Sequence, residues 1–155
     1  MNYVTYDDFK KMDMRVGLIR FVEPVEGTDK LLRFEIDFGE QAMVCAGECT
    51  PVDCDHTESD ACACEPNCKC IIPEPAFGKE EYAGRDIRQI VSGIRESFPE
   101  FKDLEGKYGL YILNLEPREI RGVTSYGMLM AVDGVDGNPV FMGPQGEINP
   151  GSKIR

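Results

Sequence analysis

The chain has 155 residues, of which 17 are basic and 28 acidic, and its net charge is −11. This length predicts one compact unit and excludes two large domains, and the composition, 42 % hydrophobic and 29 % charged, excludes wholesale disorder. No stretch approaches the roughly 20 apolar residues of a membrane span, and the N-terminus lacks the basic start and apolar run of a signal peptide. We therefore expect a cytoplasmic protein without membrane contact.

The first 40 residues predict one short helix and two strands. Thr5 with Asp8 can cap a helix near the N-terminus. Residues 15–22 form an apolar, β-branched run, which predicts a strand. Residues 32–38 alternate apolar and charged side chains, a pattern typical of a strand with one buried and one wet face.

All seven cysteines and the single histidine lie within one window of the chain. The eight side chains are Cys45, Cys49, Cys54, His56, Cys62, Cys64, Cys68 and Cys70. A structural zinc ion takes four Cys or His ligands, so eight ligands predict two zinc ions per chain. The run of cysteines typical of iron–sulfur proteins is absent, although spacing alone leaves that ligation open. Disulfides are a second alternative, disfavoured by the odd number of cysteines and by a reducing cytoplasm.

The segment around these cysteines differs from the rest of the chain in charge and composition. Residues 41–84 hold 2 basic and 9 acidic side chains. Between the ligands there is almost no large apolar residue, so metal binding has to supply the folding energy of the segment. We expect residues 41–86 to form an insertion in a domain built from residues 1–40 and 87–155.

Three further strands and a helix follow this insertion. Apolar runs at 87–94, 108–115 and 127–132 predict the strands, and Pro99 suits the first turn of a helix that ends before Gly106. Five strands with a helix before the fourth predict an all-β fold with short helices. The expected architecture is a five-stranded oligonucleotide/oligosaccharide-binding (OB) barrel, with the metal-binding insertion between its second and third strands.

Four blocks of sequence resemble one known family. They read DFKKMDMRVG at 8–17, DKLL at 29–32, RQIVSGI at 88–94 and NLEPREIRGVTSYGM at 114–128. They are similar to the tRNA-binding domain that is appended to methionyl-tRNA synthetases and is related to the endothelial-monocyte-activating polypeptide and to secretion chaperones. The resemblance implies an OB barrel, recognition of tRNA by shape, and frequent homodimerisation. The chain departs from the family pattern at 25–28, where a His-Pro-x-Ala-like stretch is common, and in the cysteine-rich insertion.

The resemblance also implies a set of RNA-binding residues. They are Arg15, Lys30, Asn114, Arg118, Arg121, Ser125 and Met128. Five of them also have an ordinary structural interpretation: a salt bridge for Arg15, a turn cap for Asn114, a solvated charge for Arg118 and Arg121, and a core position for Met128. Tyr126 lies within the last block and could stack on a base.

An enzymatic function finds little support in the sequence. The histidine belongs to the cysteine cluster, and neither a phosphate-binding glycine-rich loop nor a nucleophile elbow is present. We therefore expect a tRNA-binding protein, either free-standing or associated with a synthetase, methionyl-tRNA synthetase being the candidate partner. The alternatives are a peptide-binding, secretion-type chaperone on the same scaffold and a metal- or redox-responsive module.

A homodimer is expected from the resemblance. The apolar residues between Val140 and Ser152 could form a two-fold interface with Phe9 and Met12 of the first helix. In the alternative arrangement, this C-terminal segment closes the core of its own barrel.

Overall fold

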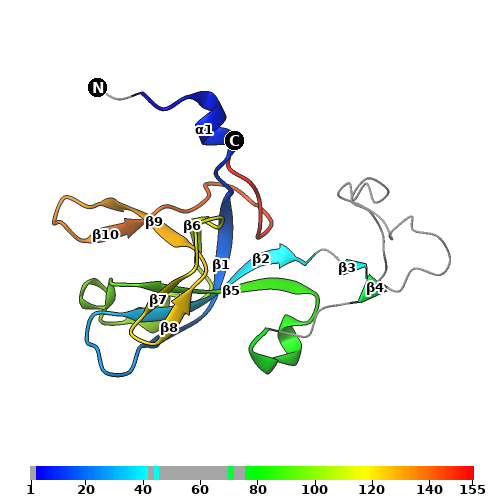
Figure 1. The fold of residues 1–155 in the computed structure, drawn as a ribbon. Helices are drawn as coiled ribbons and strands as arrows, with labels where there is room; N and C mark the ends of the chain where they lie inside the picture. The colour runs from blue at the N-terminus through cyan, green and yellow to red at the C-terminus, as the bar shows by residue number, and fades with distance from the viewer. Residues whose placement is uncertain (1–2, 42–43, 46–69, 72–75) are drawn as a thin grey trace. The chain divides into compact units, whose positions relative to one another are not determined.

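The computed structural model describes residues 3–41, 44–45, 70–71 and 76–155, of which 44–45 and 70–71 are described by their backbone alone. It divides into two compact units, one made of Met1–Gly39 and Asp86–Arg155 and the other of Glu40–Arg85 (Figure 1). Within the described residues, no helix is long and apolar enough to cross a membrane.

The larger unit is mostly β-structure with a few short helices. Its elements are α1 (Tyr6–Lys10), β1 (Met14–Pro24), β2 (Leu32–Glu40), β5 (Arg85–Ser92), η3 (Arg95–Ser97), η4 (Phe101–Leu104), β6 (Tyr108–Ile112), β7 (Arg118–Ile120), β8 (Val123–Ser125), β9 (Met128–Asp133) and β10 (Pro139–Phe141). Strands β1, β2, β5, β6 and β9 are the five strands expected from the sequence, and β10 and the β7–β8 hairpin are additional. Six strands form one sheet in the order β10-β9-β6-β1-β2-β5.

This sheet curves into a barrel for two reasons. In β1 the register against β2 shifts between Ile19 and Phe21, which leaves Arg20 as an extra residue that bends the strand. The bent strand pairs with β6 through its first half and with β2 through its second half. The chain before β9 then returns to the opposite edge of the sheet, where the N–H of Tyr126 donates to the carbonyl of Gln89 in β5 at 2.8 Å. The OB barrel expected from the sequence is confirmed.

Strand β2 differs from its sequence-based prediction in one respect. Leu32, Phe34, Ile36 and Phe38 point into the core, as the alternation predicts. The expected wet face is wrong, because Glu35 is 1 % exposed and Asp37 is fully buried. Arginine partners offset the cost of this burial: Arg33 donates to Glu35 at 3.0 Å, and Arg20, the extra residue of β1, donates to Asp37.

The helix predicted after Pro99 is also corrected. After Pro99 the chain forms one short 3₁₀ helix, η4, instead of an α-helix, and η3 lies before Pro99. Phe98, Phe101 and Leu104 pack against the core, and their spacing of three is the period of a 3₁₀ helix. Contact with the core therefore favours the tighter winding. At the N-terminus, by contrast, the predicted cap is confirmed, since Thr5 and Asp8 form a reciprocal capping box on α1.

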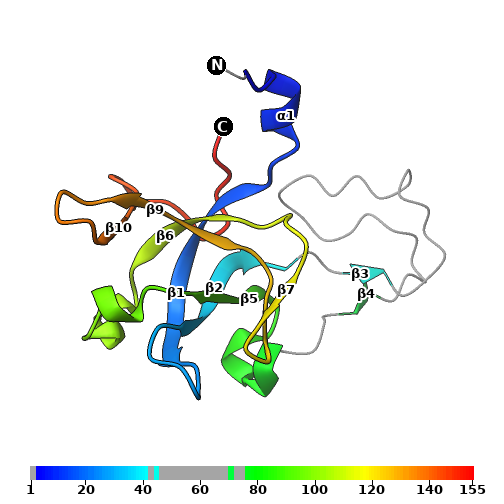
Figure 2. The ribbon, with the colours of Figure 1, turned by 60° about the vertical axis from the view of Figure 1, so that its left-hand side comes forward.

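The C-terminal segment joins the sheet beside the start of β1. The N–H of Val16 donates to the carbonyl of Ser152, and the N–H of Gly151 donates to the carbonyl of Val16. Gly151 has a φ of 86°, and a Cβ there would overlap the carbonyl oxygen of Phe38. Only glycine fits this crossing. As a result, the C-terminal segment and α1 lie at the same end of the barrel (Figure 2).

The smaller unit contains β3 (Val44–Cys45), β4 (Cys70–Ile71) and the 3₁₀ turns η1 (Ala76–Gly78) and η2 (Glu80–Tyr82). Strands β3 and β4 are antiparallel, with Cys45 directly opposite Cys70. Tyr82 is buried and meets the ring of Phe77 edge to face. The other six predicted metal ligands, Cys49, Cys54, His56, Cys62, Cys64 and Cys68, lie outside the described residues.

Candidate functional site

The connection between β6 and β9 carries most of the predicted RNA-binding residues. In an OB barrel, this connection and the loop between the first two strands border the usual nucleic-acid site. Here the connection folds into the β7–β8 hairpin, which pairs Arg118 with Ser125 and Ile120 with Val123. Arg121 and Gly122 form its tip with φ angles of 53° and 79°, the geometry of a two-residue type I′ turn. Both Arg118 and Arg121 are exposed.

The hairpin is held against β5 by polar contacts. The side-chain amide of Gln89 donates to the carbonyl of Thr124 at 2.7 Å, and the N–H of Val91 donates to the hydroxyl of Ser125 at 3.0 Å. Gln89 was not among the residues selected from the sequence. In the sequence, Gln89 stands out only as a polar residue within the apolar run 87–94. This pattern does not predict that its partner is the carbonyl of Thr124.

Ser125 and Met128 point in different directions. The Ser125 side chain is buried, and its hydroxyl also donates to the carbonyl of Gly127 at 3.0 Å, so in this structure it orders the chain. Met128 is 47 % exposed, which favours the surface interpretation over the core interpretation. Tyr126, between them, is 46 % exposed. The inward-pointing Ser125 attaches this segment to β5, whereas Tyr126 and Met128 are exposed to solvent.

Asn114 ties the start of the connection to the segment that follows α1. Its Oδ1 accepts from the N–H of Asp13 at 2.8 Å, and its Nδ2 donates to the carbonyl of Lys11. The neighbouring N–H of Leu113 donates to the carbonyl of Asp13, also at 2.8 Å. Although Asn114 is exposed, these contacts make it a cap that positions two chain segments.

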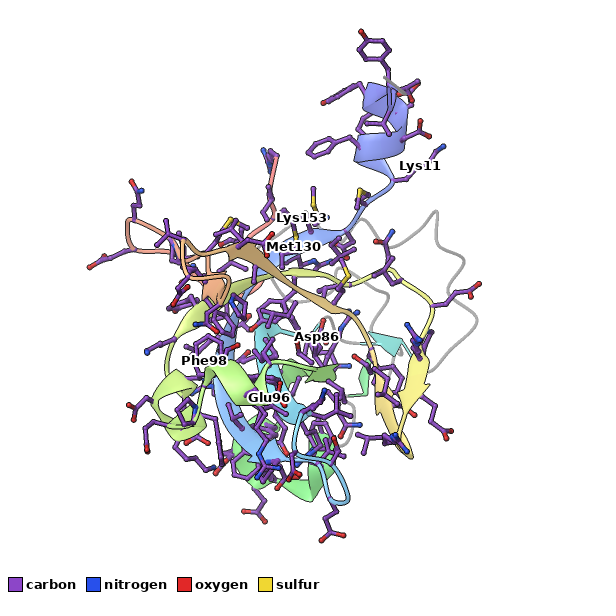
Figure 3. All side chains as sticks on the ribbon, turned by 90° about the vertical axis from the view of Figure 1, so that its left-hand side faces the viewer. Lys11, Asp86, Glu96, Phe98, Met130 and Lys153 are labelled. Atoms are coloured by element: carbon purple, nitrogen blue, oxygen red, sulfur yellow. The ribbon has the colours of Figure 1, made fainter. Side chains whose placement is uncertain are left out.

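Arg15 forms a structural ion pair. Its guanidinium binds the carboxylate of Asp13 through two hydrogen bonds of 2.8 and 2.9 Å. This pairing lowers the pKa of Asp13 and raises the pKa of Arg15, and the positive charges of Lys153 and Arg88 lower the pKa of Asp13 further. Lys153 lies opposite Arg15 in an isolated bridge, close to the end of the barrel where Figure 3 also shows Lys11.

Lys30 lies on the exposed loop between β1 and β2. The loop is fastened to η3, because the guanidinium of Arg95 donates to the carbonyl of Thr28 at 2.8 Å and the N–H of Arg95 donates to the carbonyl of Lys30. This loop and the tip of the β7–β8 hairpin lie toward the same end of the barrel, away from α1 (Figures 1 and 2). Of the seven predicted residues, Lys30, Arg118 and Arg121 form an exposed cationic group on the loop and the hairpin, and Arg15, Asn114 and Ser125 form a structural group. The seventh, Met128, is an exposed apolar residue.

The comparisons with known proteins agree with this geometry. Residues 78–153 match the family model described as "Putative tRNA binding domain". A methionine–tRNA ligase from Methanosarcina acetivorans is 32 % identical over 154 residues, which are 98 % of this chain and 15 % of that protein. These matches identify a tRNA-binding domain in the chain.

Solved structures show the same fold for this tRNA-binding domain. The MetRS-related protein from Pyrococcus horikoshii has a TM-score of 0.65 and 24 % identity, with both chains fully covered. The chaperone CsaA from Bacillus anthracis has a TM-score of 0.63 and 19 % identity, covering 99 % of this chain and 100 % of the other. The family is a binding domain rather than a catalytic one, and the chain spans only a small part of the ligase that it resembles.

Proposed function

We propose that the protein binds tRNA by shape and backbone, through the β1–β2 loop and the β7–β8 hairpin. The observation that supports this most is the placement of Arg118 and Arg121. In a chain of net charge −11, both lie exposed on a short hairpin that hydrogen bonds fasten to β5. Lys30 adds a third cation from a loop at the same end of the barrel. Contacts of this kind neutralise phosphates and carry no sequence preference.

The outward face of β2 is the usual binding face of an OB barrel, and here it suits nucleic acid poorly. Glu35 and Asp37 occupy it, both buried and paired with arginines. Because Arg20 and Arg33 are bound to these carboxylates, they offer little positive charge to a phosphate. The cations of the two loops therefore provide the better surface for RNA.

A titration of bulk tRNA across a salt series tests the function. Three phosphate contacts predict that the logarithm of the affinity falls with the logarithm of the salt concentration, with a slope of about −2 to −3. The variant Arg118→Ala/Arg121→Ala should flatten this slope by about 2. A slope near zero, together with tight binding of an extended polypeptide, contradicts the proposal and favours the chaperone function.

The sequence relationship to a synthetase supports a finer proposal. We propose that the domain acts in the cytoplasm, where it delivers tRNA to methionyl-tRNA synthetase, either as a free-standing protein or within the same assembly. Co-purification of the two proteins with and without ribonuclease treatment tests this. Loss of the association with the ribonuclease means that RNA, and not a protein contact, joins them.

We also propose a homodimer built on apolar surface that the protomer leaves exposed. Tyr6 and Phe9 on α1 are 72 and 36 % exposed, and Met12, just after α1, is 42 % exposed. The three side chains line a cleft of about 340 Å³ that residues 153–155 also line. In β10, Val140 is 48 % exposed, whereas Phe141 packs into the protomer's own core against Phe98. The C-terminal segment thus closes the core and also presents an apolar residue outward.

Light scattering at micromolar concentration tests the dimer. The wild-type protein should have twice the monomer mass, and Phe9→Glu should shift it to the monomer, because a charge at an apolar interface is costly. A wild-type monomer contradicts the proposal. Val135→Glu, on the exposed turn between β9 and β10, is the control that should leave the mass unchanged.

Zinc binding by the cysteine-rich segment remains a proposal. The pairing of Cys45 with Cys70 across β3 and β4 supports it, because two of the eight predicted ligands come together although 24 residues separate them in the sequence. Two cysteines on neighbouring strands would supply half of the ligands of a tetrahedral zinc site. The pairing is also compatible with a disulfide, and elemental analysis of the reduced protein distinguishes the two.

A further inference from the structure

Tyr126 and Met128 are two exposed side chains next to the β7–β8 hairpin. Neither belongs to the cations Lys30, Arg118 and Arg121 that are proposed to bind the phosphates of tRNA. Tyr126 and Met128 are 46 and 47 % exposed, whereas Ser125 is buried. Within the described residues, no ring contact or side-chain hydrogen bond engages Tyr126. Its ring is therefore free to accept a ligand.

The backbone beneath Tyr126 is fixed before any ligand arrives. Its own N–H donates to the carbonyl of Gln89 at 2.8 Å, and the Ser125 hydroxyl joins Val91 to Gly127. Gly127 lies so close to β6 that a Cβ there would stand 2.8 Å from the carbonyl oxygen of Ile112. A ring on so rigid a segment loses little conformational entropy when it binds.

The connection that bears the ring also carries apolar and cationic side chains. Leu115, on the same connection, is 43 % exposed. Arg118 is paired with Ser125 in the hairpin, one residue away from Tyr126, and is exposed. An aromatic ring, a thioether and a guanidinium together match a nucleotide: the base stacks on the ring, and the cation binds the phosphate.

We propose that Tyr126 stacks on the base of an unpaired nucleotide, with Met128 beside it and Arg118 on the phosphate. The proposal rests on the tRNA-binding function and narrows it, because bases inside a helix are covered on both faces by their neighbours. Only a loop, a bulge or a single-stranded end of the RNA can reach the ring. Lys30, Arg118 and Arg121 then bind the phosphate backbone of any RNA. Tyr126 adds the preference for segments whose bases are unpaired.

The experiment compares Tyr126→Phe with Tyr126→Leu. Phenylalanine keeps the ring, whereas leucine keeps apolar bulk without a π face. Binding of each variant is measured by fluorescence anisotropy with an unstructured RNA of about 12 nucleotides, with a blunt duplex of the same length and with tRNA, each across a salt series. Val135→Ala, at a fully exposed apolar side chain on the turn between β9 and β10, is the control.

We expect Tyr126→Leu to weaken binding of the single strand by about tenfold or more with an unchanged salt slope, while Tyr126→Phe stays close to wild type. Duplex binding should be the same in all variants, which also shows that the leucine variant is folded. The stacking proposal fails if the Tyr126→Leu and Tyr126→Phe variants bind the single-stranded RNA equally well. It also fails if Tyr126→Leu lowers the affinity for the single strand and for the duplex by the same factor. If the wild-type protein binds none of the three RNAs, the tRNA-binding function itself fails.

Discussion

The side-chain amide oxygen of Asn114 accepts a hydrogen bond from the backbone N–H of Asp13 at 2.8 Å, although the two residues are 101 positions apart in the sequence. The same amide donates to the carbonyl of Lys11. One side chain therefore joins the connection that bears the arginine hairpin to the linker between α1 and β1.

Asn114→Ala should lower the free energy of unfolding by about 1–2 kcal/mol, because two backbone groups lose their partner. Chemical denaturation measures this loss, and hydrogen exchange at the Asp13 amide should accelerate. Glu116→Ala, an exposed position on the same connection, is the control and should change stability by less than about 0.5 kcal/mol. An Asn114→Ala variant as stable as wild type would show that water replaces the amide.

Two substitutions of Arg121 separate the effect of backbone strain on stability from the effect of charge on tRNA binding. Its φ of 53° is unfavourable for any residue with a Cβ, so Arg121→Gly should be more stable than Arg121→Ala by roughly 1 kcal/mol. Both variants should weaken binding to all tRNAs alike and lower the salt slope by about 1, because both remove one phosphate contact. Thermal unfolding and tRNA titration measure the two effects. Affinities that differ between tRNAs would indicate base recognition at Arg121.

Tyr111→Phe tests an unpaired group in the core. The Tyr111 hydroxyl is buried, has no hydrogen-bond partner in the described structure, and lies 2.9 Å from where a Cβ on Gly109 would stand. Burial also raises the pKa of this phenol, so it stays protonated in mildly alkaline solution. Removing the hydroxyl should leave the free energy of unfolding unchanged or raise it by up to about 1 kcal/mol, whereas Tyr111→Ala should lower it by about 3–5 kcal/mol. A clear loss of stability in the phenylalanine variant would reveal a bound water molecule.

The ion pair of Asp13 with Arg15 should contribute to stability only above acidic pH. The hydrogen bonds from Arg15 hold the pKa of Asp13 below its usual value, so the folded state binds this proton less readily than the unfolded chain does. The contribution is present above about pH 4 and disappears as the pH falls through the lowered pKa. Asp13→Asn should therefore cost about 0.5–1 kcal/mol at pH 7 and nearly nothing at about pH 2. Urea denaturation at both pH values tests this, and an equal cost at the two would contradict the ion pair.

Elemental analysis of the reduced protein should find about two zinc ions per chain. A chelator should release them without unfolding the barrel, because the apolar core of the larger unit is built from residues outside 40–85. Near-ultraviolet circular dichroism before and after chelation follows the barrel. Less than one metal ion per chain with free thiols contradicts the zinc proposal, and protected thiols without metal would indicate a disulfide. Three or more zinc ions per chain would mean that cysteine sulfurs bridge neighbouring ions.

Local patterns in the sequence determined the parts of this protein that depend on neighbouring residues. The capping pair Thr5 and Asp8, the inward apolar positions of the alternation along 32–38 and the five strand runs each express a preference that a few residues satisfy by themselves. The family blocks likewise identified the OB barrel and the tRNA-binding domain. These features survive in the structure because the local preference and the fold agree.

The tertiary structure alone decided which side chains are available at the candidate site. Ser125 turns inward and Met128 outward because Val91 and Gln89, more than 30 residues earlier, bind the segment before β9. In the same way, Asp37 is buried instead of wet because Arg20 of β1 pairs with it, and the Asn114 amide is bound because α1 ends beside it. No local pattern contains these pairings, since each joins a side chain to a partner that only the closed barrel brings within hydrogen-bond distance.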